Sequence, residues 1–365
     1  MIRHVCLLAA TAPHDSNQTS FIPRRALDLE LHSLAADARP ADSTSTLSRW
    51  MQSRFAYSGE VDTSGAPGDQ DLAGFQIDSA RLAWTWTPAR DVSGTISVEA
   101  GDPAISDSSA PGVGLLDAYA SVKLAQHVGV SIGRLSQTVL WSSSLDENRR
   151  ILLDRSFLGE VLDGRDVGVE LSASLGRWNA WIAVQNGSDL AGDGLGLSGR
   201  LSCSVLGAEL PAREGGIAAP DGEHLTVGLA WFDDTDLDDG TLLAADSFFT
   251  SGRWGASAEW VDFGDDVRPL PVVNASTGAV VPSVAGAAGA QSAWNATVGF
   301  VLEPDAWEIA ARWQDLDDTA ETTLGTLGVA RHAGSARWVL QYTHAHSDDM
   351  SLDGGAFAVG IFVGF

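Results

Sequence analysis

The feature that most constrains the fold of this chain is an alternation of apolar and polar residues that recurs through most of the sequence. In one segment Val167 and Val169 alternate with Gly168 and Glu170, so that every second side chain is apolar. Successive side chains of a β-strand point to opposite faces, whereas the apolar face of an α-helix repeats every three or four residues. The pattern therefore predicts strands with one apolar face and one polar face.

Sixteen segments follow this pattern. They cover residues 48–60, 73–87, 90–101, 113–125, 127–136, 165–175, 177–187, 196–208, 223–233, 241–251, 253–264, 291–302, 305–315, 321–332, 335–347 and 353–365. The connections between them mostly alternate between tight joins, as at 175–178, and long polar stretches, as at 137–164. The connection 208–222 departs from this order, because it is long where a tight join is expected. The alternation is typical of an antiparallel barrel with its turns at one end and its loops at the other.

The composition separates a membrane barrel from a soluble β-sandwich, which would also alternate. Charged residues make up 19% of the chain, whereas soluble domains average about 25%. Glycine accounts for 39 of the 365 residues, which is more than the usual share of about 7%. Because a closed barrel has no unpaired edge, it can cross a bilayer with its apolar face turned to lipid. We therefore expect an all-β fold, a 16-stranded antiparallel transmembrane β-barrel with short periplasmic turns and long external loops.

Charge and length exclude other classes of protein. The net charge of 22 − 48 = −26 excludes a protein that binds nucleic acid unaided. No run of 18 apolar residues occurs, so a helical membrane span is excluded. With two cysteines, Cys6 and Cys203, a disulfide framework is excluded as well.

Three regions are expected along the chain. Residues 1–12 contain a short apolar run that we interpret as the remnant of a secretory signal, the alternative being an unprocessed terminus. Residues 13–47 are polar and are expected to form an N-terminal periplasmic segment. Residues 48–365 are expected to form the barrel.

Tryptophan is abundant, with 13 residues against 3 tyrosines. Many stand at the ends of predicted strands, namely Trp84, Trp86, Trp178, Trp254, Trp260, Trp307, Trp313 and Trp338. Indole rings collect at membrane interfaces, because the ring prefers hydrocarbon while its N–H needs a polar neighbour. We therefore expect an interfacial girdle, the alternative being ordinary core packing.

The long connection 137–164 is the expected source of a pore constriction, because a connection of this length in a compact domain is usually functional or disordered. Opposite charges facing each other would set a field across the opening, and the dominant sign would set the selectivity. The residues assigned to the constriction are Arg134, Arg149, Arg150, Arg155, Arg165, Asp154 and Glu160. The alternative is that these charges pair with each other or solvate an exposed loop.

Charged residues on the polar faces of the predicted strands are assigned to the lumen. They are Arg81, Glu99, Asp117, Lys123, Glu170, Arg177, Arg200, Arg253, Glu259, Glu308 and Arg312, and their charges nearly cancel.

An acidic run beginning at residue 233 has the ligand density of a calcium loop without the spacing of an EF-hand. The candidate Ca²⁺ ligands are Asp233, Asp234, Asp236, Asp238 and Asp239, the alternative being a solvated, salt-adapted surface. No other cofactor is expected.

Several short motifs resemble those of the phosphate-selective porin O/P family in their order and spacing. They lie at residues 75–82, 115–120, 130–134, 154–157, 164–169 and 306–313, followed by the terminal Phe365. The resemblance implies a trimeric 16-stranded porin whose third external loop folds into the pore and whose terminal aromatic residue is recognised by the barrel-assembly machinery. It also implies a pore lined with lysine and arginine, but Lys123 is the only lysine of this chain, which speaks against phosphate selectivity.

Together these features predict a porin of the bacterial outer membrane that lets small hydrophilic solutes or ions diffuse passively through a loop-constricted pore. Its selectivity is left open between an anion or phosphate preference and a general or weakly cation-preferring pore. The alternative function is a structural or adhesive outer-membrane protein with calcium-binding external loops. No catalytic motif is found, so no enzyme activity is expected. The expected partners are the lipid bilayer, outer-leaflet glycolipid, small solutes and further copies of the chain in a homotrimer, but no nucleic acid.

Overall fold

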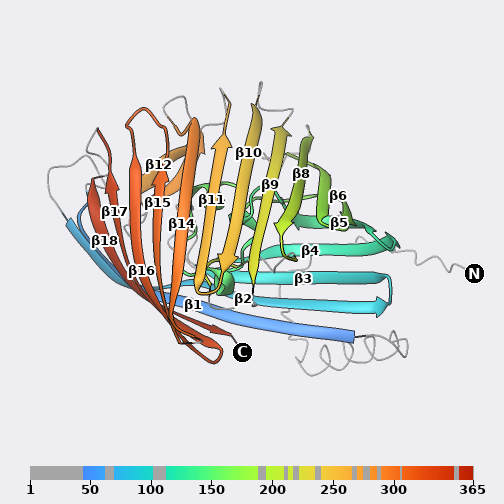
Figure 1. The fold of residues 1–365 in the computed structure, drawn as a ribbon, viewed down its shortest axis with the longest axis horizontal. Coiled ribbons are helices and arrows are strands. Elements are labelled where there is room, and N and C mark those ends of the chain that lie inside the picture. Colours follow the sequence, from blue (N-terminus) through green and yellow to red (C-terminus); the bar gives the residue numbers. More distant parts are fainter. Residues whose placement is uncertain are drawn as a thin grey trace, which may run out of the picture.

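The computed structural model describes residues 44–61, 70–101, 112–187, 195–208, 213–216, 222–234, 240–264, 269–273, 280–285, 289–304, 306–348 and 353–364. Sixteen strands in this part of the chain form one closed barrel (Figure 1). In chain order they are β1 (Thr44–Val61), β2 (Gln70–Ala89), β3 (Val92–Gly101), β4 (Gly112–Ala125), β5 (Val128–Ser136), β6 (Arg165–Leu175), β7 (Trp178–Gln185), β8 (Gly196–Leu206), β9 (Glu223–Asp234), β10 (Gly240–Ser251), β11 (Trp254–Asp262), β14 (Ser292–Glu303), β15 (Trp307–Asp315), β16 (Thr323–Ala333), β17 (Ala336–His346) and β18 (Gly354–Gly364).

The predicted 16-stranded antiparallel barrel is confirmed. The ring closes where β1 pairs antiparallel with β18, with Trp50 opposite Gly364. β6 covers the predicted residues 165–175. The first strand, however, begins at Thr44, so residues 44–47 belong to the barrel and not to the N-terminal segment to which they were assigned. The rest of that segment and residues 1–12 lie outside the described residues.

A two-stranded sheet inserted between β11 and β14 was not predicted. It consists of β12 (Pro269–Val273) and β13 (Val280–Ala285), which pair only with each other. Proline cannot donate to a strand ladder, and the prolines at 269, 271 and 282 therefore argue against strands in this connection. A two-stranded ribbon tolerates them, because one edge of each strand is free. In the part of the chain that the structure describes, no helix is long and apolar enough to cross a membrane.

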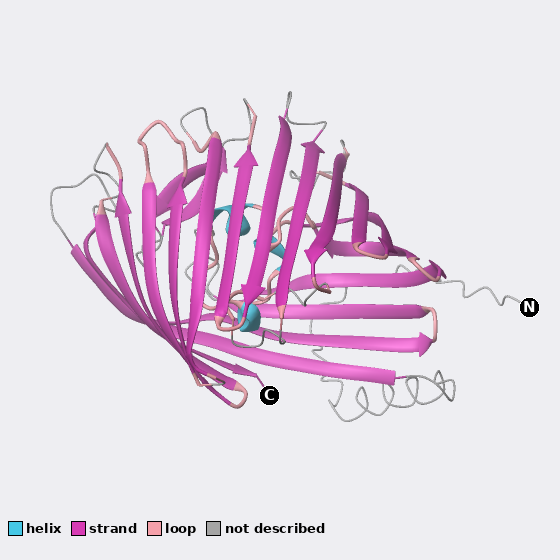
Figure 2. Ribbon diagram, in the orientation of Figure 1, coloured by secondary structure: helices cyan, strands magenta, loops and turns pink. Residues whose placement is uncertain are grey.

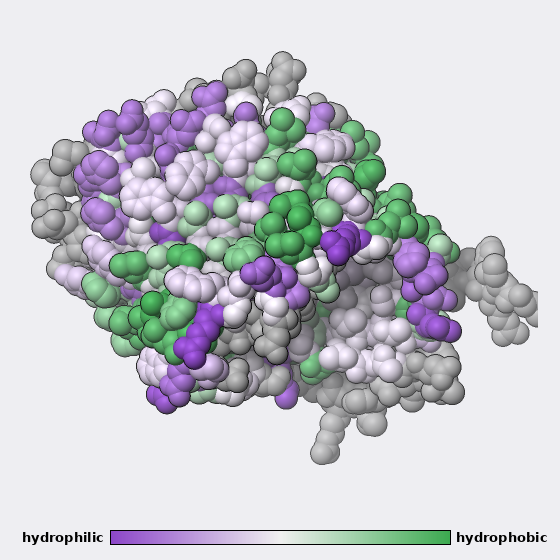
Figure 3. Space-filling model, viewed as in Figure 1, coloured by the Kyte–Doolittle hydropathy of each residue, from purple (hydrophilic) through white to green (hydrophobic). Residues whose placement is uncertain are grey.

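The two faces of the barrel wall are those of a membrane barrel, with the apolar side chains outside. Ile132, Leu229 and Leu327 point outward and expose 58%, 65% and 63% of their surface. On the inward face Gln52 and Ser97 are only 2% and 1% exposed. Figure 2 shows the strands enclosing a short helical segment, and Figure 3 shows hydrophilic residues gathered at the upper rim, where long connections lie. The wall thus offers hydrocarbon-compatible side chains to lipid and polar ones to the lumen.

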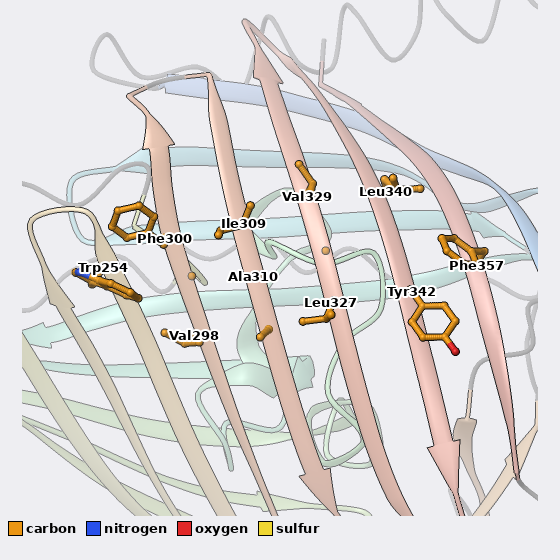
Figure 4. A pocket seen from close by; sticks show the side chains of 13 residues that line it. Trp254, Val298, Phe300, Ile309, Ala310, Leu327, Val329, Leu340, Tyr342 and Phe357 are labelled. Carbon is orange, nitrogen blue, oxygen red and sulfur yellow. The ribbon is translucent and has the colours of Figure 1, made fainter.

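Exposed tryptophans lie near both ends of the outer wall. Near the tight turns are Trp178, Trp254, Trp307 and Trp338, and near the ends that carry the long connections are Trp231, Trp260, Trp294 and Trp313. Between these ends, strands β11 and β14 to β18 carry apolar side chains on the outside, among them Leu327 and Phe357 (Figure 4). The Trp254 ring lies 4.5 Å from that of Phe300 at one end of this patch. This arrangement is the one expected of an interfacial girdle.

The assignment of the outward and inward faces can be tested with two neighbouring residues of β5. Ile132→Arg puts a charge on the lipid face near the middle of the strand and is expected to destabilise the barrel by about 2–4 kcal/mol. Ser131→Arg places the same charge on the inward face and is expected to fold like the parent protein. Folding into lipid vesicles over a urea titration measures both. Equal losses of stability would contradict the assigned faces.

Candidate pore constriction

The connection between β5 and β6, residues 137–164, folds back into the barrel, and we call it loop 3. The N–H of Gln137 bonds to the carbonyl of Gly164 at 2.8 Å, which ties the two ends of the loop together. Between them lie two 3₁₀ turns, η1 (Ser142–Ser144) and η2 (Glu147–Arg149), and a short helix, α2 (Phe157–Val161). Figure 1 shows this green segment inside the ring of strands.

Loop 3 is held first by apolar side chains seated on glycines of the inner wall. A Cβ atom on Gly328 would lie 2.4 Å from Leu152, and one on Gly360 would lie 2.5 Å from Leu153. Both leucines are buried, at 0% and 1% exposed. Because a Cβ atom does not approach another heavy atom so closely, a side chain at either position would displace the leucine that sits on it. We call Gly328 and Gly360 the glycine seats.

The helix end of loop 3 packs on a second part of the wall. Phe157 and Leu158 of α2 are 2% and 1% exposed. They belong to one buried cluster with Phe232 of β9, Leu242 of β10 and Leu324 of β16. An apolar cluster inside a polar lumen can form only where a segment covers it, because exposed apolar surface is unfavourable in water. Loop 3 therefore rests on the half of the wall that includes β9 to β18.

Polar contacts anchor the middle of loop 3 at Asp154. Its carboxyl lies 2.5 Å from Nη1 of Arg54 and accepts a hydrogen bond of 2.5 Å from the Gln341 amide, whose oxygen accepts the N–H of Leu153 at 2.9 Å. Burial alone would raise the pKa of Asp154, but Arg54 and Gln341 hold the pKa of this loop carboxyl below its ordinary range. Asp154 is therefore ionised at neutral pH and bridges β1 and β17.

The start of loop 3 is anchored in the same way. The N–H and the hydroxyl of Ser142 both donate to the Glu259 carboxylate, at 2.8 and 2.7 Å. The N–H of Trp141 donates to Asp246 at 3.0 Å, and its ring stacks on Phe248 with centroids 4.5 Å apart. Charged side chains of the wall thus serve as acceptors for loop backbone, since buried polar groups must be hydrogen-bonded.

Arg155 holds the shape of loop 3 from within. Its guanidinium donates to the carbonyls of Ser143 and Leu145, at 2.7 and 2.9 Å. It also lies 2.9 Å from the carboxyl of Asp163, and the side chain is only 2% exposed. Arg150 also forms an ion pair within the loop, because its Nη2 atom lies 2.5 Å from the carboxylate of Glu147. These two arginines therefore act as internal ties of the loop.

On its other side loop 3 faces β1 to β6 across a cavity of about 430 Å³, which we call the loop 3 cavity. Its charged lining consists of Arg81, Arg165, Asp117, Asp146 and Glu170. The uncharged lining is mostly polar and includes Ser48, Thr95, Tyr119, Ser121, Ser131, Ser136, Thr138, Ser143 and Ser144. Hydroxyls and charges of this kind suit a path for water and small hydrophilic solutes.

The two arginines of the loop 3 cavity are paired across it and along the wall. Arg81 lies 2.8 Å from Glu99 on the neighbouring strand and 2.7 Å from Asp146 on loop 3. Arg165 lies 3.1 Å from Asp117 and 2.7 Å from Asp163. Within the described residues, the carboxylate of Glu170 has no hydrogen-bond or ion-pair partner. The lining therefore holds two guanidiniums and three carboxylates, a formal charge of 2 − 3 = −1.

The structure separates the residues assigned to the constriction. Arg165 lines the loop 3 cavity, whereas Arg150, Arg155 and Asp154 are used to hold loop 3 itself. Arg149 and Glu160 lie on the exposed side of the loop. The assignment of Arg134 was wrong, because it follows the outward Ile132 by two residues and so shares its face, and its Nε donates to the Leu116 carbonyl at 3.1 Å.

Eight of the eleven residues assigned to the lumen fall into three groups. Arg81, Asp117 and Glu170 line the loop 3 cavity. Glu259, Glu308 and Arg312 are inside the barrel but only 3%, 1% and 3% exposed, because segments folded into the lumen cover them. Lys123 and Arg253 lie exposed near the tight turns. Of the remaining three, Glu99 pairs with Arg81, Arg200 pairs with Asp246, and Arg177 lies exposed in a tight turn.

The candidate calcium ligands are only partly described. Asp233 and Asp234 end β9, opposite Thr241 and Gly240 of β10. Asp236, Asp238 and Asp239 lie outside the described residues. No group of three or more His, Cys, Asp or Glu side chains within the described ranges is arranged to hold a metal ion. Calcium binding by this run stays a prediction.

Glu214 is a buried charged residue of the lumen that the sequence did not indicate. It lies in the β8–β9 connection, is 4% exposed and pairs with Arg312 at 2.7 Å inside the lumen. The one signal that pointed to it is the length of the connection 208–222, which is long where a tight turn is expected.

Solved structures of outer-membrane channels share this fold at low sequence identity. The outer membrane channel DcaP of Acinetobacter baumannii matches with a TM-score of 0.59 and 12% identity, over 90% of this chain and 99% of that one. An anion-selective porin from Comamonas acidovorans matches with a TM-score of 0.57 and 14% identity, over 89% of this chain and all of that one. Salmonella typhi OmpF matches with a TM-score of 0.56 and 12% identity, over 88% of this chain and 97% of that one. No protein-family model matches the chain, and no curated protein matches it. The fold is therefore that of the bacterial outer-membrane porins.

Proposed function

We propose that this protein is a passive diffusion channel of the bacterial outer membrane for small hydrophilic solutes and ions. The observation that carries the proposal is the loop 3 cavity, a polar space between loop 3 and strands β1 to β6 in a barrel whose outer face is apolar. Loop 3 covers β9 to β18 and the part of β1 around Ala56 with apolar contacts. Solutes therefore pass on one side of the loop, and the loop sets the width of the path.

The charges of the loop 3 cavity favour cations over anions. Both guanidiniums are neutralised by carboxylates within 3.1 Å, and Glu170 adds a carboxylate without a partner among the described residues. A ring of acidic charge at a narrow point attracts cations and repels anions. We propose a weak cation preference and no phosphate site. The Comamonas acidovorans structure is that of an anion-selective porin, so the fold accommodates the opposite preference as well.

The test is a reversal-potential measurement on single channels of the purified protein in a planar bilayer under a KCl gradient. We expect ohmic current steps and a reversal potential with the sign of a cation-preferring channel. Glu170→Gln is expected to move the potential toward zero and Glu170→Lys to move it further, while Glu303→Gln, at an exposed tight turn, serves as the control. A bilayer without current steps would refute the channel, and anion preference in the parent protein would refute the assigned selectivity.

The oligomeric state and the lipid partner belong to the same proposal. We propose a homotrimer embedded in the outer membrane, in contact with outer-leaflet glycolipid at its loop end. What supports it is the porin fold together with the continuous apolar outer face. The mass of the protein in mild detergent, measured by light scattering, tests the trimer directly.

A further inference from the structure

The β8–β9 connection differs from every other described connection at its end of the barrel. The turns between β2 and β3, β4 and β5, β6 and β7, β10 and β11, and β16 and β17 each contain two residues, and that between β14 and β15 contains three. The β8–β9 connection contains sixteen, residues 207–222. Its described central part, residues 213–216, lies inside the lumen, because Glu214 and Gly216 contact loop 3 and the inner wall. We call residues 213–216 the inner turn.

The inner turn is bonded to loop 3 at two places. The N–H of Glu214 donates to the carbonyl of Arg149 at 2.9 Å. The carboxylate of Glu214 accepts the N–H of Ile151 at 3.1 Å. Ile151 directly precedes Leu152 and Leu153, the residues that fill the glycine seats, and Arg149 lies two residues before Ile151. The inner turn thus holds the stretch of loop 3 that sits on the wall.

The same inner turn is bonded to the wall. The other carboxylate oxygen of Glu214 lies 2.7 Å from Nη2 of Arg312, and the two side chains are 2% and 1% exposed. The N–H of Gly216 donates to Glu308 at 2.6 Å. Arg312 in turn donates to the loop 3 carbonyl of Asp154 at 2.8 Å. Loop 3, the inner turn and strand β15 therefore form one hydrogen-bonded unit.

Glycines make room for the inner turn against the wall, because they carry no side chain. Gly215 has a φ of +80°, in the left-handed region that favours glycine, and a Cβ atom there would lie 2.2 Å from Glu308. A Cβ on Gly255 of β11 would lie 2.4 Å from the Gly215 backbone, and one on Gly299 of β14 would lie 3.0 Å from its Cα. Two neighbouring strands thus carry glycine where the inner turn touches them. Such close packing depends on these positions and is lost when they change.

We infer that the inner turn is a positioning element that fixes loop 3 from the end of the barrel opposite to the long connections, with Glu214 as its positioning residue. This inference rests on the proposed channel function. The inner turn touches β11, β14 and β15, whereas the loop 3 cavity is lined by β1 to β6. It therefore fills the side of the lumen that loop 3 covers. The consequence is an off-centre path whose width is stable, because loop 3 is held from the side opposite to the cavity.

Two variants test the inner turn by different means. Glu214→Ala removes the acceptor of the Ile151 N–H, and Gly215→Val forces the turn away from Glu308 without changing any charge. Glu223→Ala removes an exposed carboxylate from the first residue of β9, directly after the same connection, and is the matched control. The readouts are amide hydrogen exchange of loop 3 residues 149–153 and the open-channel current noise in planar bilayers.

Both test variants are expected to speed exchange of these amides at least about ten-fold, the factor that about 1.4 kcal/mol of lost stabilisation produces, and to raise the open-channel noise. Glu223→Ala should do neither. Unchanged exchange in both variants would overturn the inference, provided that the heat-dependent gel mobility of each variant shows that its barrel is folded. If Glu214→Ala does not fold, Glu214→Met takes its place, because methionine fills nearly the same space and also lacks the carboxylate that accepts the Ile151 N–H. Faster exchange in a protein that carries no current would uphold the positioning role and refute the channel instead.

Discussion

Filling both glycine seats, with Gly328→Leu and Gly360→Val, is expected to release loop 3 from the wall and to open the lumen to larger currents. Added side chains in a packed site cost about 1–3 kcal/mol each, and together they shift the loop toward the released state by about 30-fold or more. Single-channel conductance in planar bilayers measures the change, and we expect larger and noisier current steps with weaker ion selectivity.

The control for the glycine seats is Gly74→Val in β2. Nothing lies within 4 Å of a Cβ atom at that position, so the substitution adds a side chain in a strand without displacing loop 3. If the double variant folds and keeps the conductance and selectivity of the parent protein, the glycine seats do not hold the loop.

Arg155→Met is expected to unravel loop 3 while leaving it inside the barrel. The change removes the donor to the Ser143 and Leu145 carbonyls and leaves Asp163 with one fewer partner. Breaking one partner of a buried ion pair costs about 3–5 kcal/mol, so the loop is expected to lose its fixed shape. Chymotrypsin added to protein in vesicles is expected to cut near Phe157, which is 2% exposed in the intact loop.

Two further variants separate the role of Arg155 from a simple loss of charge. Arg155→Lys keeps the charge but lacks the planar group that reaches two carbonyls, so we expect intermediate cleavage. Arg90→Met removes an exposed arginine from a tight turn and is expected to leave loop 3 resistant. Resistance of Arg155→Met equal to that of the parent protein would show that the loop does not depend on this arginine.

The architecture was predictable because strand alternation is a local property. The alternation within each strand indicates which residues lie on which face of the barrel. The lengths of the connections indicate at which end of the barrel each of them lies. Phe362, which breaks the apolar alternation of the last segment, follows the same rule. It points inward with Ala358 and Gly360, and its ring lies 5.4 Å from that of Trp50.

The arrangement inside the lumen was not predictable, because it depends on pairs of residues far apart in the chain. Nothing near Gly328 indicates that Leu152 will sit on it, and nothing near Glu214 indicates Arg312 as its partner. Charge alone also misled, since Arg134 was assigned to the constriction although its strand position turns it outward. Arg155 has the charge expected of a pore residue, but its contacts make it a tie within loop 3.

Thiol modification during current recording tests most directly whether solutes pass between loop 3 and strands β1 to β6. The background is a protein in which Cys6 and Cys203 are replaced by serine. Ser121→Cys lines the loop 3 cavity, whereas Thr326→Cys lies on the wall that loop 3 covers and replaces a side chain only 5% exposed. We predict that a charged, water-soluble thiol reagent reduces the current through Ser121→Cys and leaves that through Thr326→Cys unchanged. Block at Thr326→Cys with none at Ser121→Cys would contradict the proposed path.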